Sequence, residues 1–523
     1  MSSPAPKSPE QSDKNKKYDR QIRLWGEHGQ SLLESAKICL VNATGLGCEV
    51  LKGLVLPGIG SFTIVDGNVV TEEDLGINFF VEASNVGQSR AASCMQLLQE
   101  LNSDVNGDCV EESVDYILAN RPAFFDNFDV VIASNLNENS LLQLSNCLWE
   151  ANVPLVYCRS LGFFGSIRLQ IKEHCVVESH PDNAQYDLRL EQPFDTLRKH
   201  LEATTITNKV PWLLVLNKYY KQWQLENNGR NPSNYKEKSQ IREMIRKDMS
   251  NDEENYEEAI KAVNTAFTGG SIPSNLKSIF EDEACRNLNK QSKSFWIMAK
   301  ALKEFIEKDN NGILPLSGVL PDMTSDTESY INLQNIYRQQ AMQDADNVYR
   351  KCQAILKELG LPLDCITEKA VRLFCKESSG LTVIRGSKIS DEYEKNNRVL
   401  SVIDDIDVQG TLTEHYIALR AYERFLTECG NIPGDCYVEN DTARFKSVAC
   451  KMLAEWGVTQ ATLSDDMVHE VCHYGGGEVH TISAFIAGCA AQEVVKILTN
   501  QFKPVDNTFI YNGITSETIT LKL

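Results

Sequence analysis

Residues 36–58 read AKICLVNATGLGCEVLKGLVLPG: an apolar, β-branched run, a turn containing Gly45 and Gly47, and then a helical pattern. The next apolar run, 61–65, is followed by Asp66. This arrangement is typical of nucleotide binding, because turn amides can face phosphates and the acid can accept ribose hydroxyls. Since the turn keeps only two glycines, a plain tight strand-to-helix turn in an α/β fold is an equal alternative.

The alternation of strands and helices continues beyond this unit. Residues 84–101 form an amphipathic segment, a helix is expected at 140–151, and apolar runs at 128–133, 153–158 and 163–171 predict further strands. Such a series predicts a doubly wound, mostly parallel sheet.

A long helical region interrupts this pattern. Helical periods dominate from about residue 182 to 474, after which a small-residue helix (481–498) and strand-like alternation (508–523) return. We therefore predict a Rossmann-like α/β domain whose sheet is completed by the C-terminal part. The predicted boundaries are a flexible tail (1–16), a first part (17–180), a mainly helical insertion (181–474) and a C-terminal part (475–523).

Composition excludes several classes of protein. The chain has 523 residues, which predicts two or three structural units. Its net charge of −20 disfavours a nucleic-acid partner. The first residues lack an apolar signal core, so we expect no secretory signal. Gln492, Glu493 and Lys496 interrupt the most apolar helix, so we expect no membrane span. Together these features predict a cytosolic or nuclear location. The sixteen cysteines show no C-x-x-C pair, which disfavours a disulfide framework and a paired zinc site.

The segment KYDRQIRLWG (17–26) is more specific than the turn. Together with GSFTIVDGNVV (60–70) and HTISAFIAGCAAQEVVKI (480–497), in this order, it resembles the adenylation domain of ubiquitin-like-modifier activating enzymes. The resemblance covers about 17–180 and 475–523. It implies a Rossmann-like adenylation domain interrupted by a helical insertion.

The chain departs from the active family pattern at several positions. In the G-x-G-G-x-G turn, Asn42 replaces the first glycine and Thr44 the third, which narrows the approach of a phosphate. Arg90 stands where the family has a lysine. The resemblance therefore implies that this chain binds no ATP, magnesium or other metal of its own, although harmless variation in a working site is the alternative. The degenerate positions are Asn42, Gly45, Gly47, Asp66, Asn68 (for a second acid), Ile77 (for an arginine) and Asn135 (for the metal-binding aspartate).

The resemblance leaves one chemical role for this chain. In the family, the segment that matches 18–21 reaches across a dimer interface, so Arg20 is the candidate to contact the partner's ATP, with Arg23 as its backup. A guanidinium suits this role because it is always charged and bridges phosphate oxygens. The alternative is that this segment is an amphipathic helix, which Ile22, Leu24 and Trp25 only dock against the rest of the fold. In that case the chain is a scaffold that contributes nothing to the chemistry.

A thioester-forming cysteine is not evident. Cys365 and Cys436 are the candidates, but neither matches the family's P-x-C-T-like loop well, and we favour a structural thiol at Cys365. A reactive cysteine would also need exposure and a lowered pKa, which a sequence does not show.

The resemblance extends over nearly the whole chain to the regulatory subunits of neddylation activating enzymes, for example at 172–190, 294–305 and 318–346. It implies a heterodimer with a catalytic subunit that supplies ATP, magnesium, zinc and the thioester cysteine. It also implies a ubiquitin-like modifier, a conjugating enzyme reached indirectly, and cullins as final targets. Amyloid-precursor-protein binding is associated with the family, but no residue here locates it. The segment implied to bind the partner includes Ile331, Leu333, Gln334, Ile336, Tyr337, Arg338, Ala341 and Ala345.

Two competing interpretations stay open. A subunit for another modifier such as SUMO would share the adenylation motifs, although that counterpart lacks so long a helical insertion. A nicotinamide-dependent oxidoreductase would explain the βαβ unit and Asp66, but it needs a cleaner glycine turn and gives no reason for the 17–26 and 490–497 motifs.

Overall fold

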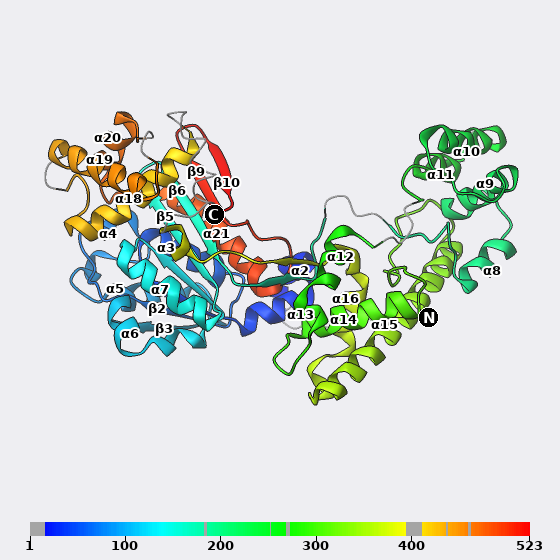
Figure 1. Cartoon of the computed structure of the whole chain (residues 1–523), viewed down its shortest axis with the longest axis horizontal. Helices are drawn as coiled ribbons and strands as arrows, with labels where there is room; N and C mark the ends of the chain where they lie inside the picture. Colours follow the sequence, from blue (N-terminus) through cyan, green and yellow to red (C-terminus); the bar gives the residue numbers. More distant parts are fainter. Residues whose placement is uncertain are drawn as a thin grey trace, which may run out of the picture. The chain divides into compact units, whose positions relative to one another are not determined.

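The structure is a computed structural model that describes residues 16–181, 186–250, 253–267, 272–393, 411–435, 438–458 and 462–523. The chain divides into two compact units. Unit 1 comprises Met1–His174 and Ile384–Leu523, and unit 2 comprises Cys175–Val383. Figure 1 colours both along the chain. The expected tail over 1–16 lies outside the described residues, apart from Lys16.

An eight-stranded sheet forms the centre of unit 1. Its spatial order is β10-β9-β6-β5-β4-β1-β2-β3, in which the five strands from β3 to β5 run parallel and the other three add antiparallel. The strands are β1 (Lys37–Val41), β2 (Ser61–Val65), β3 (Asn106–Val110), β4 (Val130–Ser134), β5 (Leu155–Leu161), β6 (Phe164–Gln170), β9 (Thr508–Asn512) and β10 (Glu517–Leu521). The order of strands reverses between β1 and β4, and ligands of such sheets bind at this point.

Helices cover both faces of this sheet. The unit 1 helices are α2 (Asp19–Ser35), α3 (Gly45–Val55), α4 (Asp74–Ile77), α5 (Arg90–Glu100), α6 (Val114–Asn120), α7 (Glu138–Ala151), α18 (Leu412–Cys429), α19 (Val438–Glu455), α20 (Asp465–Tyr474) and α21 (His480–Thr499), with short 3-10 turns at Ala83–Asn85, Pro122–Asn127 and Ile389–Tyr393. Alternate residues of β1 serve the two faces: Ile38 and Leu40 pack with α3, α5 and α21, whereas Cys39 and Val41 pack with α6 and α7.

Small residues let α3 and α21 approach closely in this core. A Cβ atom at Gly53 of α3 would lie 2.8 Å from the Cβ of Ala491 of α21. Helix α21 is long and apolar enough to cross a membrane, but 56% of its apolar window is buried, as in the core helix of a folded domain. The apolar character of α21 therefore follows from its place in unit 1.

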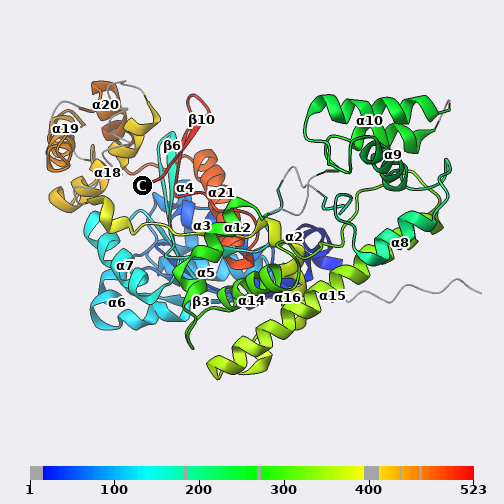
Figure 2. The same cartoon turned by 45° about the vertical axis from the view of Figure 1, so that its right-hand side comes forward.

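Helices α18, α19 and α20 form a second core of unit 1 (Figure 2), which also contains Phe164 of β6 and Ile510 of β9. A buried ion pair joins it to the sheet directly, because Arg159 Nη1 lies 2.7 Å from Glu423 Oε1 of α18. A second link runs through Glu392 of the 3-10 turn Ile389–Tyr393, which accepts from Arg168 Nε of β6 at 2.6 Å and from the Tyr416 hydroxyl of α18 at 2.9 Å. Helices α18, α19 and α20 are thus a helical extension of the sheet domain.

Unit 2 is mainly helical and has two hydrophobic cores. Its 33-residue helix α15 starts where Asp326 accepts a hydrogen bond from Ser329 N and ends at Gly360, whose φ of 66° favours glycine. The elements are β7 (His174–Val176), α8 (Asp195–Ala203), α9 (Trp212–Glu226), α10 (Tyr235–Asp248), α11 (Glu254–Ala262), α12 (Ser274–Glu281), α13 (Glu283–Arg286), α14 (Ser294–Lys308), α15 (Thr327–Leu359), a 3-10 turn at Leu363–Cys365, α16 (Glu368–Lys376), a 3-10 turn at Ser378–Gly380 and β8 (Thr382–Ile384).

The predicted fold class is confirmed: a mostly parallel central sheet, completed by C-terminal strands, carries a large helical insertion. The compact units divide the chain differently from the predicted boundaries of 181 and 474. The continuous excursion from the sheet domain is Cys175–Val383, while the helices from 411 to 474 pack on β6 and β9 in unit 1. Helical periodicity alone does not say against which unit a helix packs.

Candidate functional site

The turn between β1 and α3 has the backbone path of a nucleotide-binding turn. Asn42 adopts a φ of 67°, in the left-handed region, and α3 begins at Gly45. Thr44 caps the helix, because its Oγ1 accepts a hydrogen bond from Gly47 N at 3.1 Å. A side chain of this protein therefore uses one of the amides that a phosphate would need.

Asn42 spans the crevice between β1 and β4. Its Nδ2 donates to Ser134 O at 2.9 Å and to Asn135 O at 3.3 Å, and Ser134 Oγ donates back to Asn42 O at 3.1 Å. The crevice lies where the strand order reverses, which is the usual ligand position. Asn42 thus places an amide across the point that a glycine would leave open.

Asp66, the predicted acceptor of ribose hydroxyls, is saturated by donors of the chain itself. Its Oδ2 accepts from Ala43 N at 2.9 Å and from Arg90 Nε at 2.7 Å. Its Oδ1 accepts from both the backbone and the side-chain nitrogen of Asn68, each at 2.9 Å. The Asp66 side chain is fully buried, so no oxygen is left for a ribose.

Arg90 forms ion pairs with Asp66 and with a second buried acid, Asp74. It bridges Asp66 and Asp74, with Nη1 3.2 Å from Asp74 Oδ1, and its side chain is 14% exposed. Burial lowers the pKa of Arg90, but the two carboxylates outweigh it and hold the pKa above its ordinary value. The residue at the family's lysine position therefore acts here as an internal counter-ion.

Glu478, which lies between α20 and α21, is a site residue that was not predicted from the sequence. Its Oε2 accepts from Leu46 N, in the first turn of α3, at 2.9 Å and from Ser483 Oγ at 3.3 Å. Its Oε1 accepts from Asn135 Nδ2 at 2.8 Å. The only sequence signal is an acidic residue after the run Gly475–Gly477 and directly before a core helix.

Burial raises the pKa of Glu478, and the hydrogen bonds from Leu46 N, Ser483 and Asn135 offset part of that shift. Asn135 itself has a φ of 47° and donates to this carboxylate. The amide at the family's metal-aspartate position is therefore part of an internal hydrogen-bond network.

The 74–78 segment packs closely against the turn between β1 and α3. A Cβ atom at Gly45 would lie 2.5 Å from the carbonyl oxygen of Ile77. Asn78 is buried, and its Nδ2 donates to Ala43 O at 3.1 Å. Ile77, the position of the family's arginine, thus contributes its backbone to the closed turn.

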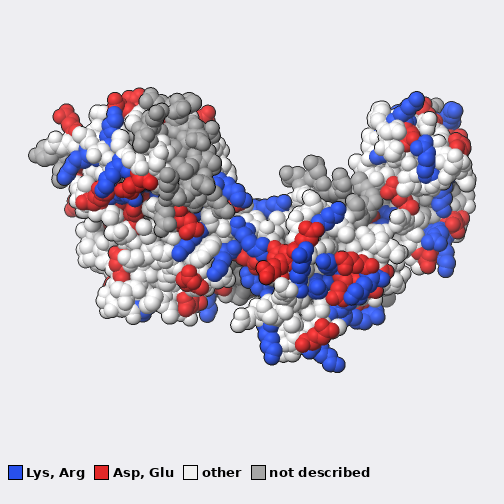
Figure 3. Space-filling view, in the orientation of Figure 1, with Lys and Arg blue, Asp and Glu red and all other residues white. Residues whose placement is uncertain are grey.

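Arg20 lies at the start of α2 and faces solvent. It is exposed, and its guanidinium makes no hydrogen bond or ion pair with the residues that the structure describes. Arg23 is 77% exposed and pairs with Asp19 at 2.8 Å, so it is engaged within its own helix. Figure 3 shows Lys and Arg interspersed with Asp and Glu on the face it displays.

Two aromatic residues dock the segment that carries Arg20. Tyr18 is 2% exposed, accepts from Asn102 Nδ2 at 3.0 Å and donates to Asp104 Oδ2 at 3.1 Å. Trp25 is buried and donates to Gln30 Oε1 at 3.1 Å. Leu24, by contrast, is 54% exposed and does not anchor the helix.

The predicted partner segment lies on α15, and its residues differ in exposure. Leu333, Tyr337 and Ala345 belong to the cores of unit 2. Leu333 and Tyr337 are fully buried, so they hold the helix in place and offer no free surface. Ile331 is 48% exposed and Arg338 is exposed. Gln334, Arg338, Ala341 and Ala345 line a cavity of about 430 Å³ together with residues of 316–320 and of α16. Ile336 is half-buried.

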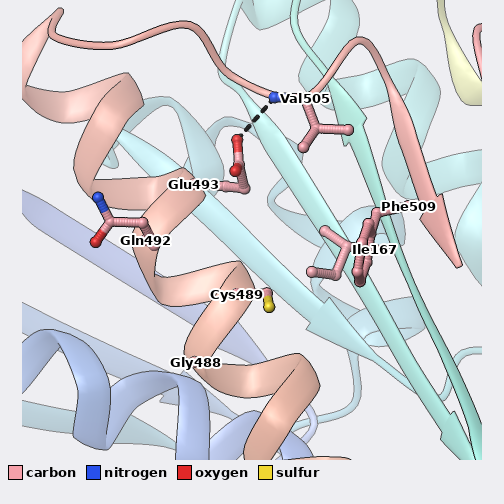
Figure 4. A pocket seen from close by; sticks show the side chains of 7 residues that line it. All are labelled: Ile167, Gly488, Cys489, Gln492, Glu493, Val505 and Phe509. Carbon is pink, nitrogen blue, oxygen red and sulfur yellow. Dashed lines mark hydrogen bonds between the residues drawn. The ribbon is translucent and has the colours of Figure 1, made fainter. Parts of the chain in front are cut away.

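A second cavity, of about 300 Å³, lies in unit 1 between α21 and the strands β6 and β9. In Figure 4 its lining is largely apolar, and the carboxylate of Glu493 points to Val505 N, from which it accepts a hydrogen bond at 2.9 Å. The lining residues are Ile167, Gly488, Cys489, Gln492, Glu493, Val505 and Phe509. None of them belongs to the turn after β1.

The structure describes one of the two candidate cysteines. Cys365 is exposed and its Sγ donates to Pro362 O at 2.9 Å, while Cys436 lies outside the described residues. In the part of the chain that the structure describes, no group of three or more His, Cys, Asp or Glu side chains could hold a metal ion.

Comparison with known proteins gives a consistent result. The ThiF family pattern matches residues 18–523. The chain is 66% identical to the Nedd8-activating enzyme E1 regulatory subunit of Drosophila melanogaster, with 100% of both chains covered. It is 45% identical to the Xenopus laevis NEDD8-activating enzyme E1 regulatory subunit, covering 98% of this chain and 99% of the relative. For the Arabidopsis thaliana regulatory subunit AXR1 the identity is 40%, covering 97% and 96%.

Proposed function

The chain belongs to the ThiF family and, within it, to the NEDD8-activating enzyme E1 regulatory subunits; from that premise we propose how it contributes to the heterodimer. Its role is that of the regulatory subunit in neddylation. We propose that it binds no ATP or magnesium of its own, and that the catalytic subunit holds both.

One observation carries this proposal: the nucleotide turn is closed by the chain's own side chains. Asp66 accepts four internal hydrogen bonds, and Glu478 and Thr44 take two of the first-turn amides of α3. A nucleotide would have to displace these contacts and leave buried carboxylates without partners, which costs several kcal/mol.

Arg20 is the proposed chemical contribution of this chain. It is exposed, forms no ion pair with the described residues, and is presented by a helix that Tyr18 and Trp25 anchor. A fixed positive charge offered in this way can reach the partner's ATP and stabilise charge on the departing pyrophosphate. If Arg20 has no such role, the chain is a scaffold for the partner.

The reaction that we propose for the heterodimer is adenylation of the C-terminus of the ubiquitin-like modifier NEDD8, followed by thioester formation on the catalytic subunit. Transfer to a conjugating enzyme and then to cullins would follow, in the cytosol or nucleus. The exposed part of the 331–345 segment supports a role in binding the catalytic subunit. We assign no site for the amyloid precursor protein.

ATP–pyrophosphate exchange in the presence of the modifier tests this proposal. The chain alone should give no exchange, and the chain with its catalytic subunit should give robust exchange. Exchange by the chain alone would show that its turn still binds and activates ATP. A control with the catalytic subunit alone measures how far activity depends on this chain.

A further inference from the structure

The position of Glu478 explains how the nucleotide turn is kept closed. The carboxylate lies at the first turn of α3, directly after β1, where a strand–turn–helix unit of this kind receives a phosphate. It belongs to a segment more than 400 residues away in sequence, which a parallel bridge between Gly162 and Glu478 brings to this edge of the sheet.

We propose that Glu478 is a built-in anion that replaces the phosphate of a bound nucleotide, so that removal of its side chain turns the closed turn into a site for a small free anion such as phosphate or acetate. Leu46 N, Asn135 Nδ2 and Ser483 Oγ converge on its two oxygens from three different elements. The Glu478 residue is only 7% exposed, so these donors are not shared with solvent.

The same contact accounts for two features of the neighbouring sequence. Asn135 donates to Glu478 Oε1 at 2.8 Å, and an aspartate in its place would bring two carboxylates together in a buried site. A Cβ atom at Gly45 would lie 3.0 Å from Glu478 Oε2, so the close approach of the carboxylate to the helix favours glycine there. The amide at 135 and the acid at 478 therefore form one arrangement.

The environment at Glu478 resembles an anion site rather than an ordinary salt bridge. Its hydrogen-bond donors are a backbone amide at a helix start, a side-chain amide and a hydroxyl, none of which carries a formal charge. Burial accordingly raises the pKa of Glu478 in spite of these bonds. An incoming anion would meet the same donors once the side chain is gone.

The test compares thermal unfolding of the full chain as wild type, Glu478→Ala and Glu478→Gln, in phosphate, acetate or chloride at constant ionic strength. Glu493→Ala is the matched control, because Glu493 is another buried glutamate with a backbone donor, on α21. We expect phosphate and acetate to raise the melting temperature of Glu478→Ala by about 2 °C or more beyond their effect on the other three proteins. Equal shifts in all four would reflect general salt effects and would overturn the proposal.

A double-mutant cycle keeps the proposal testable if Glu478→Ala does not fold. Asn135→Asp should lower the melting temperature when residue 478 is Glu, because the new carboxylate faces the old one. It should lower it much less in the Glu478→Gln background, where the shape is kept and the charge is lost. Equal losses in both backgrounds would mean that no anion sits at 478, and the inference would fail.

This inference deepens the proposed function by explaining why the chain's own turn takes no ATP. Its tests use the chain without the catalytic subunit or modifier. A negative result would therefore leave partner-dependent adenylation unaffected, whereas a failure of pyrophosphate exchange would leave the anion contact at α3 unaffected.

Discussion

Replacing Arg90 by alanine should open the closed turn. Arg90 is the counter-ion of two buried acids: its Nε lies 2.7 Å from Asp66 Oδ2 and its Nη1 lies 3.2 Å from Asp74 Oδ1. Removing one partner of a buried ion pair costs about 3–5 kcal/mol, because the other charge stays buried without compensation. Asp66 keeps its bonds from Ala43 and Asn68, so we expect a loss near the lower end, about 3 kcal/mol.

Arg90→Lys is the matched control. Lysine keeps the charge but cannot bridge both acids with a planar fork, so it should lose only about 1–2 kcal/mol. The two carboxylates hold the pKa of Arg90 above its ordinary value, and the stabilising effect of Arg90 would be lost only as pH rises through that raised pKa. The difference between the two variants should therefore be constant between about pH 6 and 9.

Hydrogen exchange is the appropriate assay, because a chain with two compact units need not unfold in a single transition. Peptides that cover β1, the following turn and β2 should exchange about 100-fold faster in Arg90→Ala, while peptides of unit 2 should not change. A change below about 1 kcal/mol in the opening free energy of these peptides would refute the view that Arg90 holds the turn closed.

Other predictions concern the interface, the core and pH. Arg20→Ala should raise the activation barrier for adenylation by the heterodimer by about 2–4 kcal/mol without weakening the dimer, and Arg20→Lys should recover part of the rate. If the chain is only a scaffold, Arg20→Ala should not change the single-turnover rate. Leu333 is fully buried, so Leu333→Ala should lower the unfolding free energy of unit 2, measured in urea, by about 2–5 kcal/mol. Ile331 is exposed, so Ile331→Asp should leave this free energy unchanged and should weaken binding of the catalytic subunit, measured by titration calorimetry. The pKa of Glu478 in the folded protein is raised above 4.5, so its protonated form stabilises the fold at low pH, and this contribution is lost as pH rises through the folded pKa. The melting temperature of Glu478→Gln relative to wild type should therefore increase from acidic to neutral pH. A difference in melting temperature that stays constant with pH would contradict this assignment.

The sheet could be predicted because its signals are local. The runs at 36–41 and 61–65 became β1 and β2 within one residue, and the 481–498 helix became α21. Strand β3, Asn106–Val110, was missed because it lies at the sheet edge and its sequence NGDCV lacks an apolar run. Local patterns thus define buried central strands better than edge strands.

The state of the site could not be predicted, because it depends on contacts between distant segments. The sequence identifies Asp66 as an acid after a strand, but Arg90 reaches it only because α5 starts beside β2. Glu478 is even more remote, since its partners Leu46 and Asn135 precede it by 432 and 343 positions. Substitutions at single positions indicated a degenerate site, and the tertiary structure shows what fills it.

The predicted interface illustrates a related limit. Sequence resemblance marks 331–345 as one segment, but a helix turns successive residues to different sides. Leu333 and Tyr337 face the core of unit 2, while Ile331 and Arg338 are exposed. Only the exposed residues can be tested as contacts without damage to the fold.

The stoichiometry of ATP binding tests the central claim most directly. Titration calorimetry of the purified heterodimer with a non-hydrolysable ATP analogue and magnesium should give one site per heterodimer, and this chain alone should give none. Two sites per heterodimer, or binding by the isolated chain, would show that the turn after β1 still accepts a nucleotide and would contradict the account.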